Sequence, residues 1–134
     1  MSKLLIGSII LIVLGIIVIA MAVNSNSNIT ENVVSENDVK TFVLTGENFK
    51  FVMDGKGNPD IVVNEGDKVR IEFSSTKGLH DFVIDELDVA TPQLRDTEEE
   101  TFVEFVADKK GTFEYYCSVG QHRENGMKGN FIVN

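Results

Sequence analysis

Cysteine, histidine and tryptophan are scarce in this chain of 134 residues, which has one, two and none of them. A single cysteine excludes an internal disulfide, so the fold must be held by packing, for which a hydrophobic fraction of 43% is sufficient. Basic residues are also few, because 12 Lys and Arg stand against 21 Asp and Glu and leave a formal net charge of −9. Nucleic-acid binding is not expected, since phosphate contacts need a positively charged surface.

The longest stretch without a charge is at the N-terminus. Residues 4–23 read LLIGSIILIVLGIIVIAMAV, and as a helix they would span about 30 Å, the thickness of the hydrocarbon core of a bilayer. Lys3 precedes this stretch and the next positive charge is Lys40, so the positive-inside rule places the N-terminus in the cytoplasm. We predict one transmembrane helix over residues 1–23. The alternative is a cleaved signal peptide, because residues 20–22 (Ala-Met-Ala) resemble a cleavage site.

The rest of the chain divides into a spacer and one domain. Residues 24–40, NSNSNITENVVSENDVK, are rich in Asn, Ser and acidic residues and show no apolar period, which is typical of a flexible linker. Residues 41–134 have the size of one globular domain. Both interpretations of the N-terminus place this domain on the extracytoplasmic side of a membrane, in a periplasm-like space or at the cell surface.

Short runs with a period of two dominate residues 41–134. From Lys68 to Phe73 charged and apolar residues alternate strictly, which predicts a half-buried strand. Gly, Asp, Asn and Pro separate the runs, and no segment has a sustained helical period, although residues 86–100 are long enough for a short helix or a loop. We predict an all-β domain, a Greek-key β-sandwich of about seven or eight strands. The other runs are 42–44, 49–53, 61–63, 82–84, 101–107, 112–116 and 130–133.

The scarce metal-binding residues are grouped. Cys117, His122 and Met127 are spaced five positions apart within the stretch YYCSVGQHRENGMKG. Alternation from Phe113 directs the Cys117 sulfur inward at one end of the sandwich, if Phe113 itself is a core residue. His80 is far away in sequence, but it stands in a loop that leads into a strand. This loop can meet the stretch that contains Cys117 at the same end of the sandwich.

Two imidazoles, a thiolate and a thioether suit copper, with three strong donors and a long, weak Met contact. Zinc rarely takes Met as a ligand. Because the fourth position is filled, no position is open for a substrate, which favours an electron carrier over an enzyme. We therefore predict one ion, alternating between Cu(I) and Cu(II), bound by His80, Cys117, His122 and Met127.

These residues also carry a family resemblance. The stretch GTFEYYC that ends at Cys117, then His122, then GMKG around Met127, with His80 upstream, resembles a cupredoxin of the plastocyanin and azurin kind over residues 41–134. The resemblance implies a type 1 (blue) copper site with these four ligands, an eight-stranded cupredoxin sandwich and one-electron transfer through the exposed edge of His122.

The chain departs from that family at two places. The residue after the upstream histidine is often an Asn that braces the copper loops, and here it is Asp81. The gap of four residues between Cys117 and His122 is longer than that of plastocyanin.

Three other functions compete with that of an electron carrier. A binuclear copper centre, as in subunit II of haem-copper oxidases, needs two bridging cysteines, and the chain has only Cys117. A mononuclear copper enzyme or red-copper-like site with an open coordination position is the alternative, since Glu124 could take the place of Met127. A copper-delivery or storage module would need a mobile tract rich in Met or His, which residues 24–40 lack. As partners we expect redox proteins, either basic ones or membrane-bound respiratory components.

Overall fold

The computed structural model describes residues 38–96 and 100–134. The predicted transmembrane helix and nearly all of the predicted linker lie outside these residues. The first strand begins at Val39, so it includes the last two residues of the segment predicted as linker. Within the described ranges, no helix has the length and apolar character that crossing a membrane requires.

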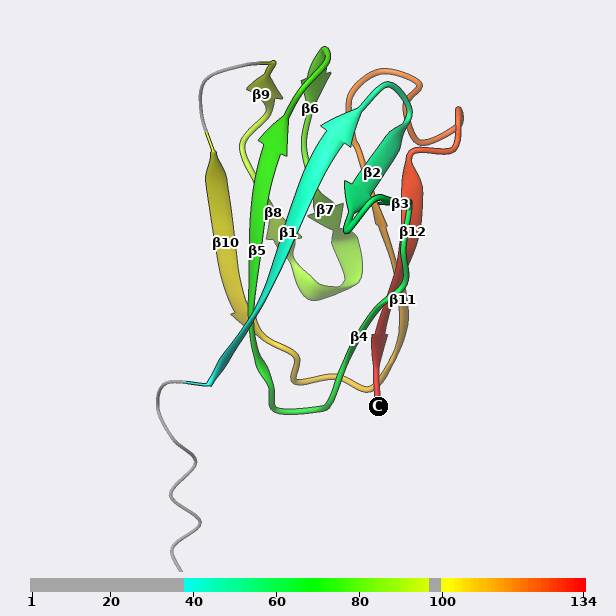
Figure 1. The fold of residues 1–134 in the computed structure, drawn as a ribbon. Coiled ribbons are helices and arrows are strands. Elements are labelled where there is room, and N and C mark those ends of the chain that lie inside the picture. Colours follow the sequence, from blue (N-terminus) through cyan, green and yellow to red (C-terminus); the bar gives the residue numbers. More distant parts are fainter. Residues whose placement is uncertain (1–37, 97–99) are drawn as a thin grey trace, which may run out of the picture. The chain divides into compact units, whose positions relative to one another are not determined.

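The described part of the chain is almost entirely β-structure (Figure 1). It contains twelve strands instead of the seven or eight predicted, because five strands of only two residues add to seven longer ones. Such short strands pair over too few residues to show a period of two in the sequence. The strands are β1 (Val39–Glu47), β2 (Lys50–Met53), β3 (Lys56–Gly57), β4 (Ile61–Val63), β5 (Lys68–Ser75), β6 (Leu79–His80), β7 (Val83–Ile84), β8 (Val89–Ala90), β9 (Leu94–Arg95), β10 (Thr101–Val106), β11 (Gly111–Tyr116) and β12 (Lys128–Val133).

The strands form two five-stranded sheets and one small ribbon. One sheet has the order β10-β5-β1-β2-β3, the other has the order β4-β12-β11-β7-β8, and β6 pairs with β9. Neighbours are antiparallel except β1 with β5 and β4 with β12, which are parallel. The two sheets face each other, since Phe51 of β2 packs edge-to-face on Tyr115 of β11 with 5.2 Å between ring centroids. The prediction of an all-β sandwich is confirmed.

Strand β5 shows how the sequence builds this core. Val69, Ile71 and Phe73 are buried, whereas Lys68 and the other alternate residues face outward. Each buried side chain of this kind contributes about 1.5–3 kcal/mol through burial. The alternation of charged and apolar residues therefore predicted this strand correctly.

The long segment at residues 86–100 was predicted to hold a short helix or a loop. Its first two residues belong to a single 3-10 turn, η2 (Asp85–Leu87). The two short strands β8 and β9 follow within the segment. Asp88 ends the turn in the left-handed conformation, with φ of 53°.

Strand β1 connects the two ends of the sandwich. It begins at Val39, which pairs with Lys68, and reaches Gly46, which pairs with Ser75. The second end is the one at which the loop between β11 and β12 lies (Figure 1). The residues predicted to bind a metal gather there.

Candidate metal centre

His80 is the last residue of β6, and only 1% of its surface is exposed. Its Nε2 lies against the backbone carbonyl of Lys77. Since a carbonyl can only accept, Nε2 carries the hydrogen and Nδ1 keeps its lone pair. Burial lowers the pKa of His80 below its ordinary value, which also favours the neutral ring. Nδ1 lies 3.8 Å from the Cys117 sulfur, so the free lone pair is on the side of the thiol.

Cys117 follows β11 directly and is fully buried. Phe113 and Tyr115 are buried on the same face of this strand, so the alternation predicted the inward direction of the sulfur correctly. Burial raises the pKa of the Cys117 thiol, because a thiolate is poorly solvated in an apolar environment. Without a metal the sulfur therefore keeps its proton at neutral pH.

His122 and Met127 are held by the turns that follow Cys117. The His122 amide donates to the Val119 carbonyl at 3.0 Å, and the Met127 amide donates to the His122 carbonyl at 2.9 Å. The Cys117 amide donates to the Met127 carbonyl at 3.2 Å. His122 is partly exposed and its Nδ1 lies 3.4 Å from the Cys117 sulfur, whereas Met127 is fully buried. The backbone thus ties three of the four predicted ligands into one compact loop.

The donor atoms of His80, Cys117 and His122 converge. All three lie within 4.8 Å of one another, and no other group of three His, Cys, Asp or Glu residues in ranges 38–96 and 100–134 does so. Two donors at ion distances of about 2.0 Å for nitrogen and 2.3 Å for sulfur are about 3.3–3.9 Å apart when they meet at angles of about 100–130°. The two sulfur–nitrogen distances fall in this range, so the three residues fit one small ion.

Asp81 braces the two ligand segments, a role that its sequence position left uncertain. Its carboxylate is 3% exposed and accepts hydrogen bonds from both the amide (2.6 Å) and the hydroxyl (2.5 Å) of Ser118. These bonds join the residue after His80 to the residue after Cys117. They also satisfy a buried negative charge that would otherwise be costly.

Gly46 allows β1 to approach His80 closely. A Cβ at this position would lie 2.9 Å from the Cβ of His80 and 3.0 Å from Cζ of Phe73, closer than packed carbon atoms normally come. A glycine inside a strand pattern often marks such an approach. That signal is visible in the sequence, but the partner of the glycine is not.

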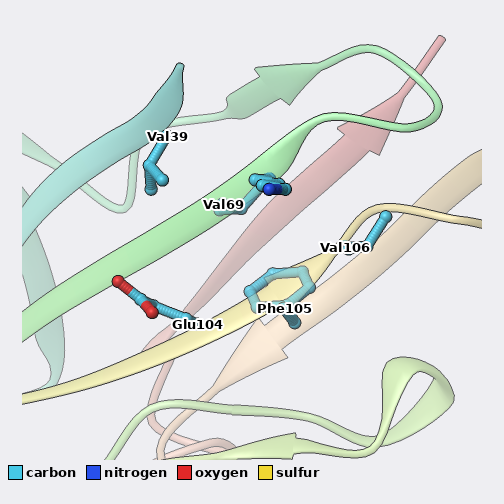
Figure 2. A pocket seen from close by; sticks show the side chains of 6 residues that line it. Val39, Val69, Glu104, Phe105 and Val106 are labelled. Atoms are coloured by element: carbon cyan, nitrogen blue, oxygen red, sulfur yellow. The ribbon is translucent and has the colours of Figure 1, made fainter. Parts of the chain in front are cut away.

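Glu124, which the enzyme alternative requires as a ligand, is exposed and does not belong to the converging group. A shallow hollow of about 220 Å³ lies at the other end of β1. Figure 2 shows Val39 on one side of β5 and Phe105 and Val106 on the other. This hollow contains no His or Cys and is not part of the metal centre.

Comparison with known proteins places this arrangement in a known fold. Neither a protein-family model nor a curated protein matches the sequence. Among solved structures, dithionite-reduced auracyanin from Roseiflexus castenholzii matches with a TM-score of 0.58 and 20% identity over 71% of this chain and 97% of auracyanin. Rusticyanin from Thiobacillus ferrooxidans matches with a TM-score of 0.60 and 24% identity over 72% of this chain and 77% of rusticyanin. The domain has the cupredoxin fold.

The same fold also occurs inside larger copper enzymes. The copper nitrite reductase from Nitrosomonas europaea matches with a TM-score of 0.61 and 23% identity, over 72% of this chain but only 41% of the reductase chain. Because the cupredoxin fold is shared by these proteins, the role of the metal centre has to be argued from its own residues.

Proposed function

We propose that this protein is a mononuclear type 1 copper protein that carries one electron at a time. The observation that carries the proposal is the convergence of a buried thiol and two imidazole Nδ1 atoms from two separate segments of the chain. Two nitrogens and one sulfur, with a Met as a weak further donor, are the set found in blue copper sites. The likeness to auracyanin and rusticyanin supports it, as the latter is a copper protein.

Copper held there would supply a one-electron change between Cu(I) and Cu(II). His80, Cys117 and His122 would be the strong ligands, with Met127 as a weak fourth one. The protein's part is to keep these donors in place in both oxidation states. The carboxylate of Asp81 and the close contact at Gly46 both restrict movement of the His80 segment.

The residue available as the fourth metal ligand favours an electron carrier over the enzyme alternative. Met127 is buried, while Glu124 is exposed and outside the converging group. With Met127 as the fourth ligand, no site would be left at which a substrate could bind the metal. The enzyme alternative is kept as an outcome of the test below, since copper nitrite reductase shares the fold.

We also propose that the domain works on the extracytoplasmic side of a membrane, tethered by residues 1–23, and meets a basic redox protein or a membrane-bound respiratory component. The apolar run at residues 4–23 and the net charge of −9 support this. Electron transfer to a basic partner should slow as salt is added, because exposed charges are screened. A rate independent of salt would count against a basic partner.

The test of the copper site is spectroscopy of the full-length protein, purified in detergent and loaded with Cu(II). A strong thiolate-to-copper charge-transfer band is expected, and Cys117→Ala should abolish it. The proposal fails if the wild type shows no such band or if Cys117→Ala retains it. A shift of the band on adding azide or nitrite would support the enzyme alternative.

The role of Met127 as a ligand needs a matched pair of variants. Met127→Leu should keep the colour and raise the reduction potential, because loss of a weak donor disfavours Cu(II). Met53→Leu is the control, since Met53 is a partly buried residue of β2 with the same chemistry. Equal potentials for wild type and Met127→Leu would exclude Met127 as a ligand.

A further inference from the structure

Phe49 has an unusual backbone conformation for its residue type. It is the second central residue of the tight turn between Glu47 and Lys50, and its φ is +58°. A turn with positive φ at this position normally has Gly or Asn there. The other described non-Gly residues with positive φ are Asp54, Asn58 and Asp88, the types that tolerate this region. Among these four residues, Phe49 is the one whose side chain is strained by the positive φ. An Asn such as the neighbouring Asn48 would fit the same position at a lower steric cost.

The ring of Phe49 contacts the exposed histidine of the metal centre. Phe49 is 45% exposed, yet its ring packs edge-on against His122, with 5.2 Å between ring centroids and 80° between planes. Strained residues that persist in a fold cluster at functional sites, where the surroundings hold them. The strain at Phe49 therefore coincides with a contact to a proposed ligand.

His122 lacks the kind of support that His80 has. The Nε2 of His80 is held by the Lys77 carbonyl, whereas the hydrogen bonds found for the His122 ring within residues 38–96 and 100–134 involve only Nδ1 and Cys117. Main-chain bonds fix the backbone of His122 but leave the rotation of its ring to packing. The hairpin that carries Phe49 also carries Gly46, which packs on His80, so one hairpin touches both imidazoles.

We propose that Phe49 is a positioning residue whose ring holds the His122 imidazole with Nδ1 toward Cys117. The inference rests on the proposed copper function of this centre. It explains why a bulky side chain stays where the backbone would favour Gly or Asn: the ring is required at His122, and the fold tolerates the strain.

This proposal predicts two effects of opposite sign. Phe49→Asn and Phe49→Gly remove the strain, so the metal-free protein should melt at a higher temperature than the wild type. The same variants remove the ring, so His122 should become more mobile. Replacing a residue with a purely structural role would not raise the melting temperature and at the same time make a ligand more mobile. Phe49→Tyr keeps the ring and should behave as the wild type does.

The first measurement uses metal-free full-length protein, with NMR relaxation of the His122 ring and the melting temperature as readouts. The second uses Cu(II) and its dissociation constant from the protein, measured against a competing chelator. We expect Phe49→Asn to bind Cu(II) about three- to tenfold more weakly, the range that the loss of an edge-to-face aromatic pair would give. Phe102→Ala is the control, because Phe102 is 53% exposed and lies on β10.

The outcomes separate this proposal from the proposed function. If the wild type shows no blue band, the copper function fails, while NMR of the metal-free protein still tests Phe49. If the band is present but His122 motion and Cu(II) affinity are the same in Phe49→Asn and wild type, the positioning role is wrong. A lower melting temperature for both Phe49→Asn and Phe49→Gly would also overturn it, because the ring would then serve the packing of the fold.

Discussion

The two histidines have the same chemistry but very different surroundings. His80 is 1% exposed, its Nε2 is bound to a backbone carbonyl, and Gly46 packs against it. His122 is partly exposed in a loop, and its ring rests on Phe49. Under the proposed function, the buried segment would set the geometry of the centre and the exposed one would offer a short path to a partner.

The largest expected effect comes from removing each imidazole in turn. His122→Gly should lose the blue band and regain it when free imidazole is added, because the gap opens toward solvent. His80→Gly should lose the band without such rescue, since the gap is buried behind β1. The measurement is an imidazole titration of both variants loaded with Cu(II). Equal rescue of the two variants would refute the contrast between the buried and the exposed side.

A smaller effect is expected from breaking the brace on the His80 side. Asp81→Ala removes the acceptor of two Ser118 hydrogen bonds, and the loss of hydrogen bonds to a carboxylate should lower the free energy of unfolding by about 2–3 kcal/mol. Urea unfolding of the metal-free protein measures it. Asp85→Ala is the matched control, because Asp85 accepts from Tyr116 at the surface and should cost less than about 0.5 kcal/mol. Equal losses would show that Asp81 does not brace the loops.

The close contact at Gly46 can be tested in the same way. Gly46→Ala places a Cβ 2.9 Å from His80, and such overpacking should cost about 1–3 kcal/mol and shift the copper band as His80 moves. Gly57→Ala is the control, since its nearest contact is the Lys50 side chain at 3.6 Å. If Gly46→Ala changes neither stability nor spectrum, β1 does not confine His80.

Much of this contrast was not predictable from the sequence. Alternation in β5 predicted the sandwich, and the scarcity of Cys and His predicted three residues that the structure brings together. The supports of the centre depend on contacts across long sequence separations: Gly46 with His80, Phe49 with His122, and Asp81 with Ser118. No local pattern encodes which loops meet at an end of a sandwich, so these roles became visible only in three dimensions.

A last prediction concerns protons at the buried side of the centre. Burial raises the pKa of the Cys117 thiol and lowers that of His80. At neutral pH the His80 imidazole is therefore uncharged, with a lone pair ready for a metal, while the sulfur still holds its proton. A metal must displace that proton, and below the thiol pKa its affinity should rise about tenfold, or about 1.4 kcal/mol, per pH unit. Protonation of His80 should not lower the metal affinity further until the pH falls to the lowered pKa of this residue.

Zinc affinity of the metal-free protein, measured against a competing chelator between about pH 6 and 8, checks this slope. Proton release in a weakly buffered solution gives an independent reading, and we expect at least one proton for each ion bound. An affinity that does not change with pH would mean that Cys117 is already a thiolate in the folded protein. In that case a nearby positive charge or donor would have to outweigh its burial, and the buried side of the centre would be less apolar than the packing around His80 indicates.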